Sequence, residues 1–422
     1  MMRRITLPIL TFASDYQKPP ESWDSEYTCG RDDIPSYVPS SHGETPVKVH
    51  VFFRHGMRTD FQRHSCFPNG AQPEYQCSLK TQVGFENGVS RPSLLVKDYK
   101  EGCEIGQLLD YSEVQMARLA GYLKQAYGTL VDSALESASA ASGGSSVYLR
   151  STDKARTLGS LDLLLEALVG NTRKTLPVHT QQFEEDPLSL NVQKCPKLDY
   201  LNGQFVQSSA VKQLTTDSAY YKQCESMWNK EIGTPFNLVD AGDCLFAPKC
   251  AKVPLPNNIV PSDELYACVW NLFNSLRHLK YGYLKLWKEG SDFSNIATTP
   301  IWQELLTVAS DSHTKVSFWA THDDVLACML SSAGLWDGAW PKYASFLLFE
   351  EYADGHIRII SEGVEIAQRA SWSELVPAYA LDPEKFQTAC VSTPQVTATQ
   401  SSYGDLLFRG LGVSALLNIL TA

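Results

Sequence analysis

Short hydrophobic runs recur along the chain, and each has the length of a β-strand. Five of the seven residues from 47 to 53 are apolar, a pattern typical of a strand buried on both faces of a sheet. Comparable runs predict strands near residues 146–150, 176–180, 315–321, 345–352 and 356–361. Helical patterns separate several of these runs, so the chain is expected to adopt an α/β fold.

The order of these patterns divides the chain into a core and an insertion. The strand-like runs fall within residues 46–185 and 300–390, which are expected to form one α/β domain. Between residues 186 and 299 the pattern turns helical, most clearly over 264–287, and indicates an inserted segment. With 422 residues, 43% of them hydrophobic, the chain is long enough for two closely packed domains.

The first strand-like run leads directly into Arg54-His55-Gly56-Met57-Arg58. Two arginines flank one imidazole, and the glycine lets the backbone come close to a ligand. A strand that ends in such a cationic turn can hold a phosphate against a nucleophilic histidine. The alternative is an ordinary basic loop after a strand.

A second cluster of ionisable residues follows the run at 315–321. There, His322-Asp323 precedes apolar residues at helical spacing that begin at Val325. A strand, a His-Asp turn and a helix make one βα unit of an open sheet, in which ligands bind beyond the carboxyl ends of the strands. Both motifs are therefore expected to face one crevice, although a lone histidine beside a strand is more often structural.

Further segments lie between and after the two motifs. They are Gly106-Gln107-Leu108, residues 147–153 with Arg156-Thr157-Leu158, Pro177-Val178-His179-Thr180, residues 191–196, and Trp340-Pro341 with Tyr343-Ala344-Ser345. Over about residues 46–390 the whole pattern resembles the histidine acid phosphatases, the family that includes lysosomal and prostatic acid phosphatases and fungal phytases. This resemblance implies a phosphoglycerate mutase-like open sheet with helices on both faces. It also implies that residues 186–299 form a mainly helical cap over the active site.

The same resemblance implies a role for each of six residues. His55 would attack phosphorus and form a phosphohistidine, and Asp323 would protonate the leaving alcohol. The residues that would bind the phosphoryl oxygens are Arg54, Arg58, Arg150 and His322. Water would then hydrolyse the intermediate, and no metal or other cofactor is expected.

Elementary electrostatics supports these roles. Arginine stays charged at any working pH, and its forked donors match phosphate oxygens. Like charges about 4 Å apart repel by roughly 4 kcal/mol at an effective dielectric near 20, so the arginines should lower the pKa of His55. Bound phosphate should favour the protonated form of Asp323. We therefore predict an acidic pH optimum.

One position departs from the family pattern. Where the family usually has proline two residues after the second arginine, this chain has Thr59-Asp60. Without proline the turn is expected to be less restrained, and the added carboxylate is expected to weaken phosphate binding. A non-catalytic phosphate- or glycan-binding relative therefore stays open as an alternative.

The net charge of −11 and the pI near 5.3 argue against nucleic acid or anionic membrane surfaces as partners. The expected partner is a small-molecule phosphate monoester, and the sequence leaves the oligomeric state open. Of the remaining histidines, His278 has the spacing of a helix surface or edge and is interpreted as a structural residue. His179 belongs to an expected strand and is interpreted as a structural residue in preference to a site residue.

Eleven cysteines are many for a cytosolic enzyme and indicate an oxidising compartment. The family resemblance implies a disulfide between Cys195 and Cys390. Short separations suggest Cys66 with Cys77 and Cys244 with Cys250, and a zinc site is the rival interpretation of the second pair. Cys328, on the apolar face of a helix, is expected to be the free thiol. Four cysteines stay unassigned: Cys29, Cys103, Cys224 and Cys268.

Both ends of the chain carry segments outside the expected domains. Residues 1–13 resemble a short signal peptide, with a basic start and a compact apolar run. Residues 391–422 form a Ser/Thr-rich linker and an apolar tail that is short for a membrane span. The tail is expected to be either a lipid-anchor signal or a packed terminal helix. We expect a secreted or lysosome-like location in the secretory pathway, with membrane anchoring left open.

The function expected from these observations is hydrolysis of phosphate monoesters at acidic pH through a phosphohistidine. The close alternatives are a phytase and a phosphatase of sugar phosphates such as a phosphoxylose.

Overall fold

The computed structural model describes residues 29–30, 34–40, 44–61, 66–79, 103–138, 145–169, 176–182, 185–190 and 195–391. The expected signal peptide at 1–13 and the tail after residue 391 lie outside these residues. Within the described part of the chain, no helix is long and apolar enough to cross a membrane.

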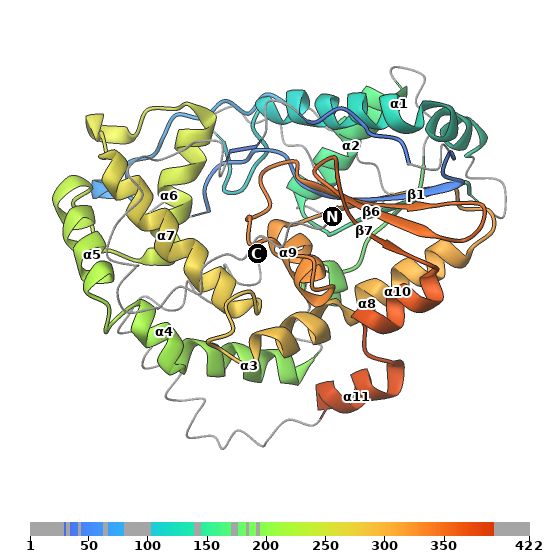
Figure 1. The fold of residues 1–422 in the computed structure, drawn as a ribbon. Coiled ribbons are helices and arrows are strands. Elements are labelled where there is room, and N and C mark those ends of the chain that lie inside the picture. The colour runs from blue at the N-terminus through green and yellow to red at the C-terminus, as the bar shows by residue number, and fades with distance from the viewer. Residues whose placement is uncertain are drawn as a thin grey trace.

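A seven-stranded mixed sheet has the strand order β3-β2-β4-β1-β5-β6-β7. In Figure 1 it lies on the right, between α1 and α2 above and α8 and α10 below. Its parallel half consists of β1 (Lys48–Arg54), β2 (Val147–Ser151), β3 (Val178–His179) and β4 (Val316–Thr321). Its antiparallel half consists of β5 (Phe346–Glu351), β6 (Ile357–Ser361) and β7 (Val364–Arg369). The first six strands confirm the sequence prediction.

Strand β7 has no counterpart among the predicted strands. Its side chains are exposed or half-buried, so its sequence lacks the apolar run that marks the other strands. A turn at Glu362-Gly363, where both φ angles are positive, connects it to β6. Such a two-residue hairpin turn is the signal that could have identified this edge strand.

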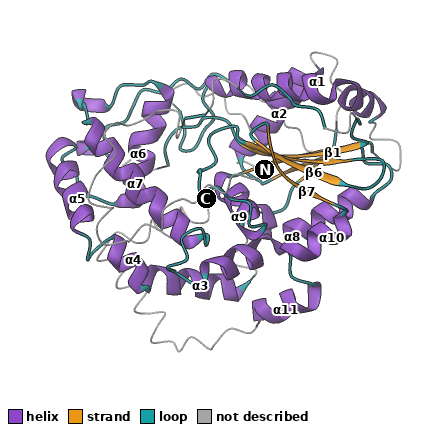
Figure 2. Cartoon of the chain, in the orientation of Figure 1, coloured by secondary structure: helices purple, strands orange, loops and turns teal. Residues whose placement is uncertain are grey.

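Helices cover both faces of the sheet, as predicted (Figure 2). Alternate residues of β1, Val49, Val51 and Phe53, face α1 (Tyr111–Ser137) and α2 (Ala155–Val169). Phe52 faces the opposite side, where it stacks on Trp319 at 4.7 Å between ring centroids. That side is covered by α8 (Gly290–Ser310), α9 (Asp323–Ser332) and α10 (Trp372–Tyr379), and α11 (Pro383–Val391) follows α10. A strand buried on both faces explains the unbroken apolar run of β1.

The inserted segment is helical in its described part. Its helices are α3 (Pro196–Gln207), α4 (Ser209–Leu214), α5 (Ala219–Glu231), α6 (Leu238–Ala251) and α7 (Asp263–Lys280). Helices α5, α6 and α7 enclose a hydrophobic cluster of their own, which includes Trp228, Leu245 and Leu265. Helix α8 starts before the expected boundary at residue 300 and packs against α9 of the core. The division at residue 300 therefore cuts through a helix.

Five disulfides are present: Cys29–Cys250, Cys66–Cys244, Cys77–Cys103, Cys195–Cys390 and Cys224–Cys268. The pair implied by the family resemblance is confirmed, and Cys328 is a free, buried thiol as predicted.

The two pairs suggested by short separations are wrong. Cys244 and Cys250 both lie on α6, and six residues of helix separate their Cα atoms by about 9 Å along the axis, too far for one disulfide. They instead bond to Cys66 and Cys29 and so fasten α6 to segments near the end of β1. The zinc interpretation fails for the same reason, because neither sulfur is a free thiolate.

Candidate active site

The carboxyl ends of β1, β4 and β2 bring the two predicted motifs together. In the parallel register, Arg54 lies opposite Thr321, and the His55 backbone N–H donates to the Thr321 carbonyl oxygen over 3.1 Å. The residues that follow these strands are therefore neighbours. The rings of His55 and His322 lie 5.6 Å apart between centroids.

The backbone after His55 is held by the helices on one face of the sheet. The Gly56 N–H donates to Ser160 Oγ of α2 over 2.9 Å, and the Met57 N–H donates to Gln115 Oε1 of α1 over 2.7 Å. A Cβ atom on Gly56 would stand 2.6 Å from the Cβ of Ser112. The motif requires glycine here because α1 passes too close for any side chain.

Hydrogen bonding assigns the protonation state of His55. Its Nδ1 lies 2.8 Å from the Gly56 carbonyl oxygen, and a carbonyl oxygen only accepts, so Nδ1 carries the proton. Burial lowers the pKa of His55 well below its usual value, and Arg156, Arg54, His322 and Arg58 add to this effect. The neutral ring therefore keeps a lone pair on Nε2.

Three guanidinium groups surround this ring: Arg54, Arg58 and Arg156. Each has a buried Nε–H with no hydrogen-bond acceptor among the described residues. Arg54 lies over the Tyr343 ring, and Arg58 lies over the Phe61 ring. Burial, together with the charge of Arg58, lowers the pKa of Arg156 to about 9. Three buried cations with spare donors make a strongly anion-attracting site.

Arg150 is the one predicted site residue that the structure does not bring into this cluster. Its guanidinium is buried between two carboxylates, donating from Nη1 to Asp186 Oδ2 and from Nε to Glu304 Oε1, each over 2.9 Å. Arg156, six residues later in the first turn of α2, lies beside the two histidines instead. Arg156 belongs to the same sequence segment as Arg150, but nothing in the segment tells which arginine turns toward His55.

His322 is also neutral in this environment. Arg156 Nη2 lies 3.4 Å from Nδ1 and Thr152 Oγ1 lies 3.0 Å from Nε2. Because a guanidinium only donates, Nδ1 is the acceptor and Nε2 carries the proton. Burial and the charge of Arg156 lower the pKa of His322 well below its usual value.

Asp323 begins α9 and lies between the cations. Its Oδ2 accepts from Arg54 Nη2 and from Trp340 Nε1, each over 2.9 Å. Burial favours the neutral acid, but Arg54 and Arg277 outweigh it, so the pKa of Asp323 lies below its usual value. Burial and the neighbouring Asp323 raise the pKa of Asp324. The free site therefore holds Asp323 as a carboxylate.

The two residues in place of the family proline are restrained by hydrogen bonds. The Thr59 N–H donates to the Gln107 carbonyl oxygen over 2.9 Å, and the Gly106 N–H donates to the Asp60 carbonyl oxygen over 3.2 Å. The buried Asp60 carboxylate accepts from Tyr75 Oη over 2.9 Å. Pairing with residues 104–108 thus restrains a turn that proline would otherwise stiffen.

Residues from the insertion complete the surroundings of the site. Asp243 of α6 forms an ion pair with Arg58, with Nη1 and Oδ1 3.0 Å apart, and Arg277 of α7 lies over the Trp340 ring. Sequence reasoning missed both residues, since neither belongs to a motif. The packing of α6 and α7, and not a sequence motif, brings Asp243 and Arg277 to the site.

The two other histidines considered from sequence lie outside the cluster. His179 is exposed and stacks on Tyr148 at 4.5 Å between ring centroids. His278 of α7 is half-buried against Tyr283 and Trp336, at the edge of the helix surface.

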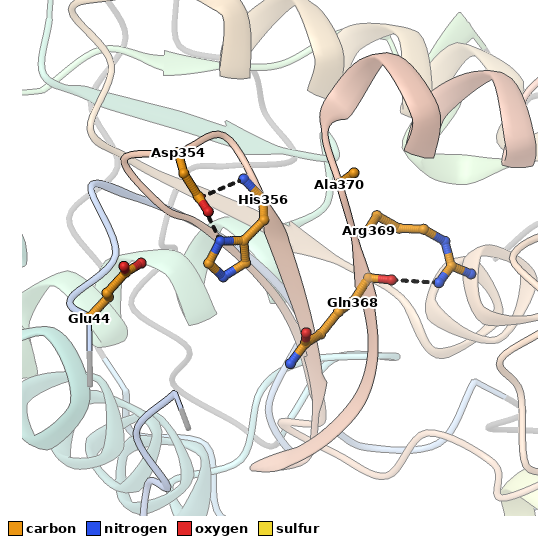
Figure 3. Close-up of a pocket in the computed structure, with 6 residues that line it drawn as sticks. All are labelled: Glu44, Asp354, His356, Gln368, Arg369 and Ala370. Carbon is orange, nitrogen blue, oxygen red and sulfur yellow. Dashed lines mark hydrogen bonds and ion pairs between the residues drawn. The ribbon is translucent and has the colours of Figure 1, made fainter. Parts of the chain in front are cut away.

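A pocket of about 380 Å³ lies at the opposite edge of the sheet, beside the β5–β6 turn (Figure 3). Its lining includes Glu44, Asp354 and His356, whose ligand atoms lie within 4.8 Å of one another. Asp354 Oδ1 already accepts from the backbone N–H of His356 and approaches His356 Nδ1. Both carboxylates are exposed, so the geometry gives no reason to assign a metal here.

The fold and this arrangement define a class of α/β proteins that gather arginines around a histidine at the end of a central strand. The pattern of the histidine phosphatase superfamily (branch 2) matches residues 47–309, more than half of the chain. The chain therefore belongs to the histidine phosphatase superfamily, branch 2. The family resemblance seen in the sequence is confirmed.

Curated relatives are distant in sequence. "Lysophosphatidic acid phosphatase type 6" of Mus musculus is 23% identical over 382 residues, which cover 82% of this chain and 88% of the mouse protein. "Lysosomal acid phosphatase" of Bos taurus is 25% identical over 293 residues, or 64% of this chain. "Putative acid phosphatase 5" of Caenorhabditis elegans is 25% identical over 266 residues, or 58% of this chain. The chain spans 66% of the bovine protein's length and 58% of the worm protein's length.

Solved structures confirm the fold. The phytase of Hafnia alvei in complex with myo-inositol hexakis sulphate superposes with a TM-score of 0.54 at 13% identity, over 84% of this chain and 99% of the phytase. The phytase of Citrobacter braakii gives a TM-score of 0.52 at 13% identity, over 80% of this chain and 100% of the phytase. At this identity the likeness concerns the fold alone, and it agrees with the predicted open sheet.

Proposed function

We propose that this chain hydrolyses phosphate monoesters at acidic pH through a phosphohistidine formed on His55. The observation that carries the proposal is the neutral His55 ring, with a free lone pair on Nε2, among three buried guanidinium groups with spare donors. Membership of the histidine phosphatase superfamily and the acid phosphatases among the relatives support it.

In the first half of the reaction, His55 Nε2 attacks phosphorus while the bond to the ester oxygen breaks. Arg54, Arg58 and Arg156 bind the phosphoryl oxygens and offset the negative charge on them. His322 donates its Nε2–H to a phosphoryl oxygen once this hydrogen bond shifts from Thr152 to the phosphoryl group. We assign to Arg156 the oxygen-binding role that the sequence suggested for Arg150.

Asp323 supplies the proton that the leaving alcohol needs. In the free site Arg54 keeps it ionised, but a phosphate dianion offsets the charge of Arg54 and favours the protonated acid. Asp323 then protonates the ester oxygen as the alcohol departs. In the second half, water attacks the phosphohistidine, gives its proton back to Asp323 and releases phosphate, so that His55 is again neutral.

Five disulfides among the described cysteines fit an oxidising compartment, and one relative is named for the lysosome. We therefore place the protein in the secretory pathway, in a secreted or lysosome-like location.

Phosphate release from an aryl phosphate between pH 4 and pH 8 tests the proposal. Parallel reactions with inositol hexakisphosphate and a phosphorylated xyloside show whether the enzyme is a general phosphomonoesterase, a phytase or a sugar phosphatase. Absence of turnover on all three substrates, with phosphate binding retained, would show a non-catalytic phosphate-binding protein.

A further inference from the structure

Arg277 is a cation from the inserted helices that lies at the active site without a partner. It belongs to the last turn of α7, and its guanidinium lies over two aromatic rings, 3.4 Å from the Phe273 centroid and 4.1 Å from the Trp340 centroid. Two rings on one guanidinium restrict it to a narrow range of positions. The side chain is therefore held in place before any ligand binds.

The position of Arg277 is on the leaving-group side of the site. Trp340, which Arg277 contacts, donates through Nε1 to Asp323 Oδ2. Burial lowers the pKa of Arg277 to about 10, and Asp323 is the strongest charge that opposes this shift. Because Asp323 must face the departing oxygen, Arg277 lies near the part of the substrate that carries that oxygen.

Arg277 differs from two arginines of the site in its contacts. Arg54 is paired with Asp323 and Arg58 with Asp243. Arg156, like Arg277, makes no ion pair among the described residues and contacts His322 instead. Among the described residues, the Arg277 guanidinium makes no ion pair and donates no hydrogen bond. None of its nitrogens is a buried atom without a partner, so the guanidinium stays accessible and can donate to an anionic ligand.

We propose that Arg277 binds a second anionic group, carried by the leaving alcohol of the substrate. This inference rests on the proposed phosphatase function and narrows its substrate class to phosphomonoesters with a carboxylate or a further phosphoryl group near the ester oxygen. The guanidinium fork matches both groups with two parallel hydrogen bonds. Arg277 would thus determine specificity, whereas Arg54, Arg58 and Arg156 hold the reacting phosphoryl group.

Binding of matched phosphonates tests this inference without turnover. 3-Phosphonopropionate carries a terminal carboxylate where propylphosphonate carries a methyl group, and 1,2-ethanediphosphonate replaces that carboxylate with a second phosphonate. Calorimetry on the wild-type protein should show that 3-phosphonopropionate, the diphosphonate or both bind about 10- to 100-fold more tightly than propylphosphonate. A pair of charge-assisted hydrogen bonds to the second anionic group predicts a difference of this size. Whichever of these two ligands binds more tightly then identifies the anionic group, carboxylate or phosphoryl, that Arg277 prefers.

Arg277→Gln should remove this preference and leave the affinity for propylphosphonate unchanged. Arg277→Lys, which keeps the charge but loses the fork, should keep part of the preference. Arg369→Gln on β7 is the matched control, since Arg369 lines the pocket beside the β5–β6 turn at the opposite edge of the sheet and its guanidinium donates to the Gln368 carbonyl oxygen. Should Arg277→Gln fail to fold, the ligand preference of the wild-type protein and its partial loss in Arg277→Lys still test the inference.

Equal binding of all three ligands by the wild-type protein would overturn the inference. A preference that survives in Arg277→Gln would overturn it as well. The kinetic counterpart compares 3-phosphoglycerate with glycerol 3-phosphate, for which Arg277→Gln should lower kcat/KM more for the carboxylate-bearing substrate, since any effect through the pKa of Asp323 is common to both. Failure to hydrolyse either substrate would contradict the proposed function, whereas the phosphonate affinities would still decide the role of Arg277.

Discussion

The edge of the sheet and the helical insertion contribute to the site in different ways. The edge supplies its residues in contiguous segments: Arg54, His55 and Arg58 follow β1, and His322 and Asp323 follow β4. The insertion supplies single residues, Asp243 from α6 and Arg277 from α7, on helices whose sequences otherwise serve packing. On the function proposed here, chemistry common to all substrates would lie at the strand ends, and Arg277 of the insertion would contact the variable part of a substrate.

The largest expected effect concerns the nucleophile at the sheet edge. His55→Ala should reduce kcat by about 10⁴-fold or more, since no other described group can form the covalent intermediate. Thermal unfolding should change little because His55 follows the strand and takes no part in a hydrophobic cluster. Rapid acid quench with labelled substrate should trap an acid-labile phosphoenzyme in the wild type and none in the mutant. A wild type without a burst or a trapped phosphoenzyme would refute covalent catalysis.

The second prediction separates two arginines that the sequence places six residues apart. Arg156→Ala removes a donor from the phosphoryl oxygens and should lower kcat/KM about 100- to 1000-fold, with a small change in Tm. Arg150→Ala leaves Asp186 and Glu304 without their cation and should destabilise the fold by about 3–5 kcal/mol. Denaturant unfolding and steady-state kinetics on both mutants check this division. A stable but inactive Arg150→Ala would restore the role that the resemblance implied for Arg150.

These arginines also show what the sequence can predict. The strands, the two motifs and their meeting at one edge follow from local patterns, because parallel strands end at the same edge of a sheet. The direction of a side chain at the junction of β2 and α2 depends on Asp186 and Glu304, which lie 36 and 154 residues further along the chain. The same limit applies to the cysteines of α6, whose partners depend on how the insertion lies against the core.

The third prediction concerns Asp323 as the general acid. Asp323→Asn should slow alkyl phosphates much more than aryl phosphates with good leaving groups, since only the former need a proton in the transition state. A loss of about 100- to 1000-fold on alkyl substrates and about 10-fold or less on aryl substrates is expected, from kcat/KM on both. Equal losses would transfer the acid role to Asp324 or water.

The pH profile of the same mutant gives an independent check. Asp323 acts while protonated, so the wild-type rate on alkyl phosphates should fall as pH rises through the pKa of Asp323 in the substrate complex. The low pKa of His55 means that the nucleophile stays neutral well below pH 6.5, so the acid limb should lie below that value. Asp323→Asn should lose the alkaline limb and keep the acid limb.

The smallest expected effect lies at the contact between the insertion and the phosphate loop. Asp243 both positions Arg58 and places a negative charge near the phosphate, and two substitutions separate these effects. Asp243→Asn keeps an acceptor for Arg58 but removes the charge, so KM for an aryl phosphate should fall about two- to five-fold at an unchanged kcat. Asp243→Ala removes the acceptor as well, and kcat should fall about five- to ten-fold because Arg58 loses a hydrogen bond that is worth about 1 kcal/mol.

Asp263→Asn, at the exposed start of α7, is the matched control and should change neither parameter. Identical kinetics for Asp243→Asn and Asp243→Ala would mean that the insertion acts on the phosphate loop through charge alone, so that α6 contributes no positioning to the sheet edge.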